Sequence, residues 1–216
     1  SCVTPAHVAE LAVTVHVSLN GKDLSVSSQT FDFYPDPHVD SLSVTTGVAN
    51  GGTTVTVYGS NFDNTYGMEL AIGPDTLTPS FTSSTVLTFS TPDILVTGVI
   101  TPGTPTLRDV EVSLNNGVDY TNDHVLFEYH YEPTVATVDP VIGPASGNSL
   151  VTVTGTNFVN SALLQCRWDG VAGELTQATF VSDTELRCHS PQGFYAGLTV
   201  SSVEVTNNGV DFTPTS

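Results

Sequence analysis

The length, composition and charge of the chain exclude a nucleic-acid partner and a membrane span: 22 acidic residues oppose four basic ones in 216 residues, for a formal net charge of −18, and phosphate binding needs clustered lysine and arginine. No apolar run approaches the roughly 20 residues that a spanning helix requires, so direct membrane insertion of this segment is not expected. Valine, threonine and serine dominate, glycine and proline recur at short intervals, and no stretch keeps an apolar stripe at helical spacing, which predicts an all-β protein of about two domains.

The first segment, residues 1–36, ends in the aromatic strand Phe31-Asp32-Phe33-Tyr34, which a polar turn at 19–24 precedes. Elements of this kind make only the last strands of a sandwich and leave a sheet edge and an apolar face bare. We therefore expect residues 1–36 to be the C-terminal part of a truncated module.

Residues 37–131 carry the elements of one complete module. At 54–58 and at 110–114 valines or leucine alternate with polar residues, as half-buried strands require. An Asn-Gly pair at 116–117 predicts a tight hairpin turn, and a second aromatic strand at 127–130 closes the module.

Residues 132–216 repeat the middle segment. The strand at 54–57 and the motif Gly59-Ser60-Asn61-Phe62 return 96 residues later as 150–153 and Gly155-Thr156-Asn157-Phe158. The turn at 114–120 returns at 206–212, and the segment stops before a counterpart of the aromatic strand. We expect a module that lacks its last strand.

The order of these motifs resembles the IPT/TIG family, the immunoglobulin-like fold of plexins and many surface proteins. The motifs that carry the resemblance in the third segment are Pro140, Gly143, Gly147, Gly155-Thr156-Asn157-Phe158, Cys166-Arg167-Trp168-Asp169-Gly170 and Leu186-Arg187-Cys188-His189-Ser190-Pro191. The resemblance implies tandem immunoglobulin-like β-sandwiches of IPT/TIG type over the whole chain.

The repeated glycine motif is interpreted as structural rather than as a ligand site. Glycine permits a backbone turn that a side chain would obstruct, and asparagine can bond its own loop. The phenylalanine is expected to plug the end of the sandwich. The residues concerned are Gly59, Asn61, Phe62, Gly155, Asn157 and Phe158.

The resemblance also implies a disulfide, because Cys166 and Cys188 occupy the two cysteine positions of the family. The corresponding positions of the middle segment are assigned to Ala71 and Phe89, so both cysteines are lost together there. Cys2 is left without a partner within the chain. A disulfide places the chain in an oxidising, extracellular compartment.

No pattern of catalytic, cofactor-binding or metal-binding residues is found, so the chain is not expected to be an enzyme. His124 and His130 stand on one strand but are about 20 Å apart if it is extended, too far to share a metal. Asp36 and Glu132 occupy equivalent linker positions where calcium is an option. A solvated acidic surface is the favoured interpretation, because no further acidic cluster supports them.

Carbohydrate could be bound by the protein or be attached to it, and the sequence was searched for both. Trp168, Tyr58, Tyr66 and Tyr195 are the aromatic candidates for a sugar platform, although nothing in the sequence arranges them as one. No N-glycosylation sequon occurs. Threonine and proline clusters are candidates for O-glycosylation, and they lie at 101–106 and 213–216.

Three classes of function remain: a structural or adhesive fibre or stalk, a protein-binding receptor ectodomain, and a carbohydrate-binding module. Short proline-containing linkers at 34–37 and 131–133 restrict the angles between neighbours and favour the first class. The expected partners are adjacent modules of the same chain or other copies of it.

Overall fold

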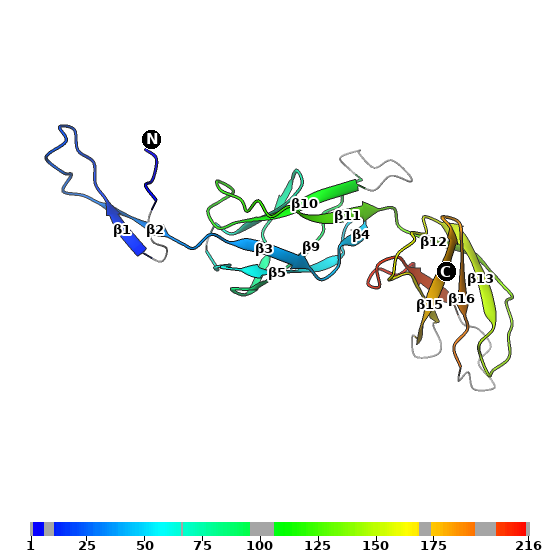
Figure 1. The fold of residues 1–216 in the computed structure, drawn as a ribbon. Coiled ribbons are helices and arrows are strands. Elements are labelled where there is room, and N and C mark those ends of the chain that lie inside the picture. Colours follow the sequence, from blue (N-terminus) through cyan, green and yellow to red (C-terminus); the bar gives the residue numbers. More distant parts are fainter. Residues whose placement is uncertain are drawn as a thin grey trace.

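The computed structural model describes residues 2–6, 11–65, 67–95, 106–168, 174–192 and 202–214. All of its regular elements in these ranges are β-strands, which confirms the predicted all-β class. Figure 1 shows them as an N-terminal hairpin, a middle sandwich and a C-terminal sandwich. The described residues include no helix that could cross a membrane.

The N-terminal hairpin pairs an aliphatic strand with a strand in which phenylalanines alternate with polar residues. Strand β1 (Leu11–Val15) runs antiparallel to β2 (Gln29–Phe33), with Val13 opposite Phe31. The two form a two-stranded sheet that no other described strand extends. Most of β2 is exposed, because no other described sheet covers it.

The middle sandwich contains two sheets that enclose one core. One sheet has the order β4-β11-β10-β6-β7 and the other the order β3-β5-β9-β8. Their strands are β3 (His38–Leu42), β4 (Thr46–Val48), β5 (Thr54–Ser60), β6 (Glu69–Ile72), β7 (Asp75–Leu77), β8 (Ser80–Ser83), β9 (Val86–Ser90), β10 (Thr106–Ser113) and β11 (Val125–His130).

The core of this sandwich comes from the alternation that the sequence shows. Val55 and Val57 of β5 are fully buried, as are Val110 and Val112 of β10. Successive side chains of a strand point to opposite faces, so one apolar face of each sheet meets the other. The aromatic strand β11 contributes Phe127 and Tyr129 to the same core.

The C-terminal sandwich repeats this arrangement with one long strand shared between its two sheets. The strand order is β12-β13-β16-β15-β14-β17, in which β15 pairs with both β16 and β14. Its strands are β12 (Thr134–Asp139), β13 (Leu150–Thr156), β14 (Gln165–Trp168), β15 (Glu174–Ser182), β16 (Glu185–His189) and β17 (Val203–Thr206).

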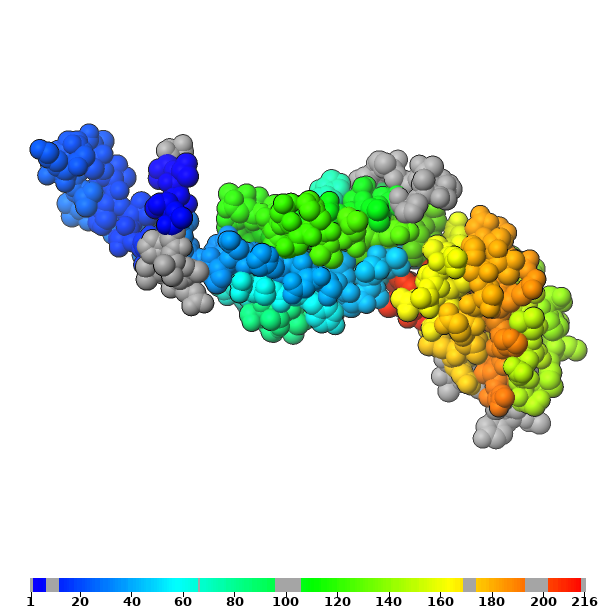
Figure 2. All heavy atoms as spheres, viewed as in Figure 1, coloured from blue at the N-terminus to red at the C-terminus, as the bar shows by residue number. Residues whose placement is uncertain are grey.

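The two sandwiches follow each other along one direction, and the hairpin lies beyond the middle one (Figures 1 and 2). The last described turn, drawn in red, folds back toward the middle sandwich near β4. The joint between the sandwiches therefore involves more than the linker at 131–133.

Candidate functional site

The repeated glycine motif lies where each linker enters its module. An added Cβ on Gly59 would overlap the carbonyl oxygen of His38 and the ring of Phe62. The same atom on Gly155 would overlap the carbonyl oxygen of Thr134 and approach the Phe158 ring. Glycine is needed here because the first strand of the module and the phenylalanine plug both pack directly against the backbone.

The asparagine of the motif holds the linker rather than its own loop. Asn61 and Asn157 have positive φ angles of 59° and 62°. Their Nδ2 atoms donate hydrogen bonds to the carbonyl oxygens of Asp36 at 2.8 Å and Glu132 at 2.9 Å. The expectation of a bond within the loop was wrong, because the left-handed backbone turns each side chain toward the linker.

The phenylalanine plugs, Phe62 and Phe158, are buried, with 2% and 3% of their surface exposed. The motif as a whole thus fixes the point at which a linker becomes a strand. Its chemistry is that of a structural joint.

The joint between the two sandwiches has a second attachment, which the sequence did not reveal. The Nδ2 atom of Asn208 donates to the carbonyl oxygen of Thr46 at 2.9 Å. The Thr53 hydroxyl donates to Oδ2 of Asp211 at 2.7 Å. Thr53 and Asn208 are almost completely buried, so these bonds are shielded from water and are worth more than surface bonds.

A third contact connects the linker itself to the middle sandwich, where Asn50 Nδ2 donates to Oε2 of Glu132 at 3.1 Å. Glu132 is therefore held by its carbonyl on the C-terminal sandwich and by its carboxylate on the middle one. The two sandwiches are therefore connected through Glu132 of the linker and, separately, through the bonds of Asn208 and Asp211.

The turn that carries Asn208 and Asp211 occurs three times in the chain, and we call it the Asn–Asp turn. In each copy the asparagine Oδ1 accepts from the aspartate N–H, at 2.8 to 2.9 Å, and its Nδ2 donates to the aspartate carboxylate, at 2.7 to 2.8 Å. The residue pairs are Asn20 and Asp23, Asn115 and Asp119, and Asn208 and Asp211. The Asn-Gly pairs pointed to the turn but not to this asparagine–aspartate pair.

The entrance to the middle sandwich is also held by a carboxylate. Asp123 accepts from the Val39 N–H at 2.7 Å and lies 3.1 Å from Nδ1 of His38. Burial acts to raise the pKa of Asp123, but the Val39 N–H and the neighbouring His38 together hold it below the ordinary value. Asp123 thus anchors the first strand of this module in its ionised form.

Cys166 and Cys188 form a disulfide between β14 and β16, with 6.4 Å between their Cα atoms. Both are fully buried, whereas Cys2 is free and exposed. The strand registers correct one assignment in the middle sandwich. Cys166 faces Val205 on β17, and the corresponding neighbour of Val112 on β10 is Leu70 rather than Ala71.

The candidate sugar-binding residues do not form a platform in the described part of the chain. Trp168 is buried and donates its ring N–H to the Thr176 hydroxyl at 2.8 Å. Tyr58 is exposed on β5. Thr213 is buried and bonded to the backbone of Val205, so its hydroxyl is not an accessible glycosylation site. Tyr66, Tyr195, Asp169, Gly170 and residues 101–105 lie outside the described residues.

The structure places His124 apart from His130 and beside two acids of β10. Ligand atoms of Asp109, Glu111 and His124 lie within 4.8 Å of one another. The Glu111 carboxylate already accepts from the Thr121 hydroxyl and the His124 N–H, so the group is satisfied without an ion. The pairing of β10 with β11 creates this group, which spacing along the sequence did not indicate.

Comparisons with known proteins agree with this fold. The IPT/TIG domain model matches residues 37–129 and 133–216. Plexin-A3 of Rattus norvegicus is 24% identical over 180 residues, which are 81% of this chain and 9% of that protein.

Two solved structures to which the chain is similar are the full extracellular region of plexin A4 and the surface glycan-binding protein PbSGBP-B from Prevotella bryantii. The first has a TM-score of 0.49 and 20% identity over 88% of this chain and 16% of that chain. The second has a TM-score of 0.31 and 13% identity over 83% of this chain and 41% of that chain. The family match covers both sandwiches with their two glycine motifs and the disulfide, and the chain belongs to the IPT/TIG domain family.

Proposed function

We propose that the chain is a non-enzymatic, stiff spacer in an extracellular protein, in which consecutive IPT/TIG modules are held at a defined angle. The observation that carries this proposal is the direct bonding between the sandwiches, from Thr53 to Asp211 and from Asn208 to the Thr46 carbonyl. A flexible connection would need no such contacts. The proposed modules are residues 37–131 and 132–216, preceded by the partial module 1–36.

The geometry of the joint favours stiffness over free rotation. The Asn157 bond fixes where the linker leaves, and the Asn–Asp turn contacts the middle sandwich at a separate point. A body attached at two separated points resists both bending and twisting, and Pro133 further restricts the linker between them. Neighbouring modules of the same chain are thus the first partners of each module.

An extracellular location is supported by two observations. The buried disulfide suits an oxidising compartment. The sequence similarity to Plexin-A3 and the fold match to a plexin extracellular region point the same way. The strongly acidic surface resists self-aggregation of an exposed, elongated protein.

Of the three classes of function that the sequence left open, the receptor ectodomain and the surface stalk are favoured, because a stiff spacer serves either of them. A sugar-binding module is disfavoured because the only tryptophan, Trp168, is buried in the core. Assembly into a fibre is a separate question, because it requires contacts between different copies of the chain.

Small-angle X-ray scattering tests the proposal. We expect the scattering of the wild-type chain to fit one arrangement of the two sandwiches, independent of salt. Thr53→Val removes the donor to Asp211 while keeping the shape of the side chain, and it should broaden the distance distribution. Ser149→Ala, the corresponding change in the C-terminal sandwich, is the matched control. A wild-type profile that already requires an ensemble of angles would overturn the proposal.

A further inference from the structure

The asparagine that holds the joint is followed by glycine, and such a pair is chemically labile. Asparagine is among the residues that degrade on heating, and a following glycine has no side chain to obstruct attack by its nitrogen on the asparagine carboxamide. The chain has four Asn-Gly pairs, at 20–21, 50–51, 116–117 and 208–209. The asparagines of the first three pairs are exposed, whereas Asn208 has 1% of its surface exposed. Asn208 is thus the labile asparagine whose reaction the fold controls.

The closed joint restrains each group that deamidation of Asn208 needs. The attacking nitrogen, that of Gly209, donates its proton to the Thr206 hydroxyl at 2.9 Å. The leaving nitrogen, Nδ2 of Asn208, donates to the Thr46 carbonyl oxygen at 2.9 Å and to the Asp211 carboxylate at 2.8 Å. The Oδ1 atom of Asn208 accepts from the Asp211 N–H at 2.8 Å. These bonds hold the carboxamide away from the glycine nitrogen while the joint is closed.

The Asn–Asp turn of the N-terminal hairpin contains the same pair outside the joint. Asn20 is also followed by glycine, and its side chain bonds Asp23 through the same atoms that connect Asn208 to Asp211. Asn20 is exposed, and among the described residues no other module accepts a hydrogen bond from its Nδ2. The comparison of Asn20 with Asn208 therefore isolates the effect of the joint on the same local chemistry.

We propose that Asn208 is a deamidation site that reacts only when the joint opens, and that the reaction then keeps the joint open. This inference rests on the spacer function. In the open joint the Gly209 nitrogen loses its proton to solvent and attacks Cγ of Asn208. The new C–N bond closes a succinimide ring, and the Cγ–Nδ2 bond breaks to release ammonia. Water then adds to either carbonyl of the ring and leaves aspartate or isoaspartate at this position.

The product of this reaction cannot restore the joint. A carboxylate at position 208 has no N–H to donate, so it faces the Thr46 carbonyl oxygen and the Asp211 carboxylate as an acceptor against two acceptors. The two negative charges also repel each other in a place that is shielded from water. Isoaspartate in addition lengthens the main chain before Asp211, which accepts the bond from Thr53. The modification therefore records that a joint has opened and makes its loss of stiffness permanent.

Peptide mass spectrometry of the whole chain, incubated at mildly alkaline pH, measures the rate of deamidation at each asparagine. We expect Asn20 to deamidate in the wild-type chain while Asn208 stays intact. Thr53→Val should speed the reaction at Asn208 about tenfold, because the loss of one shielded hydrogen bond raises the open fraction of the joint by about that factor. The rate at Asn20 should stay unchanged in the same sample.

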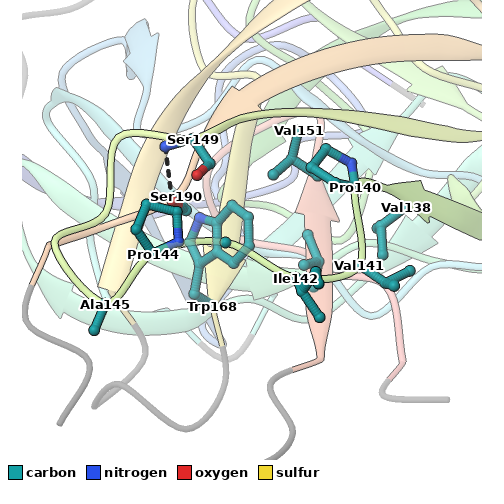
Figure 3. A pocket seen from close by; sticks show the side chains of 12 residues that line it. Val138, Pro140, Val141, Ile142, Pro144, Ala145, Ser149, Val151, Trp168 and Ser190 are labelled. Carbon is teal, nitrogen blue, oxygen red and sulfur yellow. Dashed lines mark hydrogen bonds between the residues drawn. The ribbon is translucent and has the colours of Figure 1, made fainter. Parts of the chain in front are cut away.

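Ser149→Ala is the matched control for this rate. Ser149 stands 96 residues after Thr53 and precedes β13, at the end of the strand opposite to the linker. Figure 3 shows it beside Ser190, whose hydroxyl accepts from the Ser149 N–H at 3.0 Å. The change should leave both rates at their wild-type values. Deamidation of Asn208 as fast as that of Asn20 in the wild-type chain, or a rate at Asn208 that does not respond to Thr53→Val, would overturn the proposal.

The effect of the product is tested with Asn208→Asp, which places aspartate at this position from the start. Small-angle scattering of this variant should require an ensemble of angles between the two sandwiches. Asn20→Asp adds the same charge beside Asp23, outside the joint, and should keep the wild-type arrangement of the sandwiches. The rate comparison above does not depend on the folding of either variant. An Asn208→Asp chain with the wild-type arrangement would overturn this inference alone, whereas an ensemble in the wild-type chain would overturn the spacer function as well.

Discussion

The middle and C-terminal sandwiches share their strand registers but close their cores in different ways. Among the described residues the middle core has seventeen buried hydrophobic residues, including Phe127 and Tyr129 of β11. The C-terminal core has ten, including the disulfide-bonded Cys166 and Cys188. At the place where the middle core has the apolar pair Leu70 and Phe89, the C-terminal core has the covalent link between Cys166 and Cys188.

This difference shows that the IPT/TIG frame tolerates two sources of stability at the same place. A disulfide limits the unfolded chain, whereas the buried side chains of Leu70 and Phe89 stabilise the folded one by removing apolar surface from water. The two modules should therefore respond differently to the same treatment.

The largest effect is expected for Phe127→Ala, which removes a fully buried ring from the middle core. The free energy of unfolding of this module should fall by about 3–5 kcal/mol. Calorimetry should show an earlier transition for the middle module and an unchanged one for the C-terminal module. Phe31→Ala, on the exposed face of β2, is the matched control and should leave both transitions in place. Equal losses in both modules would contradict the separation of their cores.

Reduction of the disulfide should have the next largest effect, and on the other module. The linked residues are 22 positions apart, and closing a loop of this length contributes about 3 kcal/mol. Thermal unfolding with and without reductant should move only the C-terminal transition. The comparison fails if the middle module, which has no disulfide among its described residues, loses as much stability.

The hydrogen bonds from Asn61 and Asn157 to the linker carbonyls should contribute less, and equally at the two positions. Asn157→Ala removes the bond to the Glu132 carbonyl and places alanine at a positive φ, which should cost about 2 kcal/mol in all. Asn157→Gly keeps the backbone conformation and should recover about half of the loss. If glycine behaves like alanine, the hydrogen bond and not the backbone angle carries the effect. Asn61 should give the same pair of values in urea unfolding.

The smallest effect is a pH dependence confined to the middle module. The pKa of Asp123 is lowered in the folded state, so the stabilisation is present above the ordinary aspartate pKa and is lost as the pH falls through the lowered value. The middle transition should therefore weaken in acid. Asp123→Asn should remove this part of the pH dependence, and an unchanged acid profile in that variant would contradict the role of Asp123.

Patterns local in the sequence predicted the strands, the repeat and the IPT/TIG family, and these were confirmed. The disulfide that the structure contains follows from family positions rather than from spacing. Contacts that depend on the pairing register of strands, or on how one module is placed against the next, could not be predicted from the sequence. Ala71 was assigned as the counterpart of Cys166, but the strand register gives its neighbour Leu70. An error of one residue along a strand moves the side chain to the opposite face of the sheet. The bond from Thr53 to Asp211 joins residues 158 positions apart in different modules, and no local signal marks such a pair.

If the Asn–Asp turn of the C-terminal sandwich fixes the angle between the two sandwiches, residual dipolar couplings of backbone amides will report one common orientation. A rigid joint requires one alignment tensor to fit both residues 37–131 and residues 132–214 of the wild-type chain. Thr53→Val should then separate the two tensors, while Asp23→Ala, in the equivalent turn of the N-terminal hairpin, should leave them coincident. Two different tensors in the wild-type chain, or coincident tensors in Thr53→Val, would contradict the account.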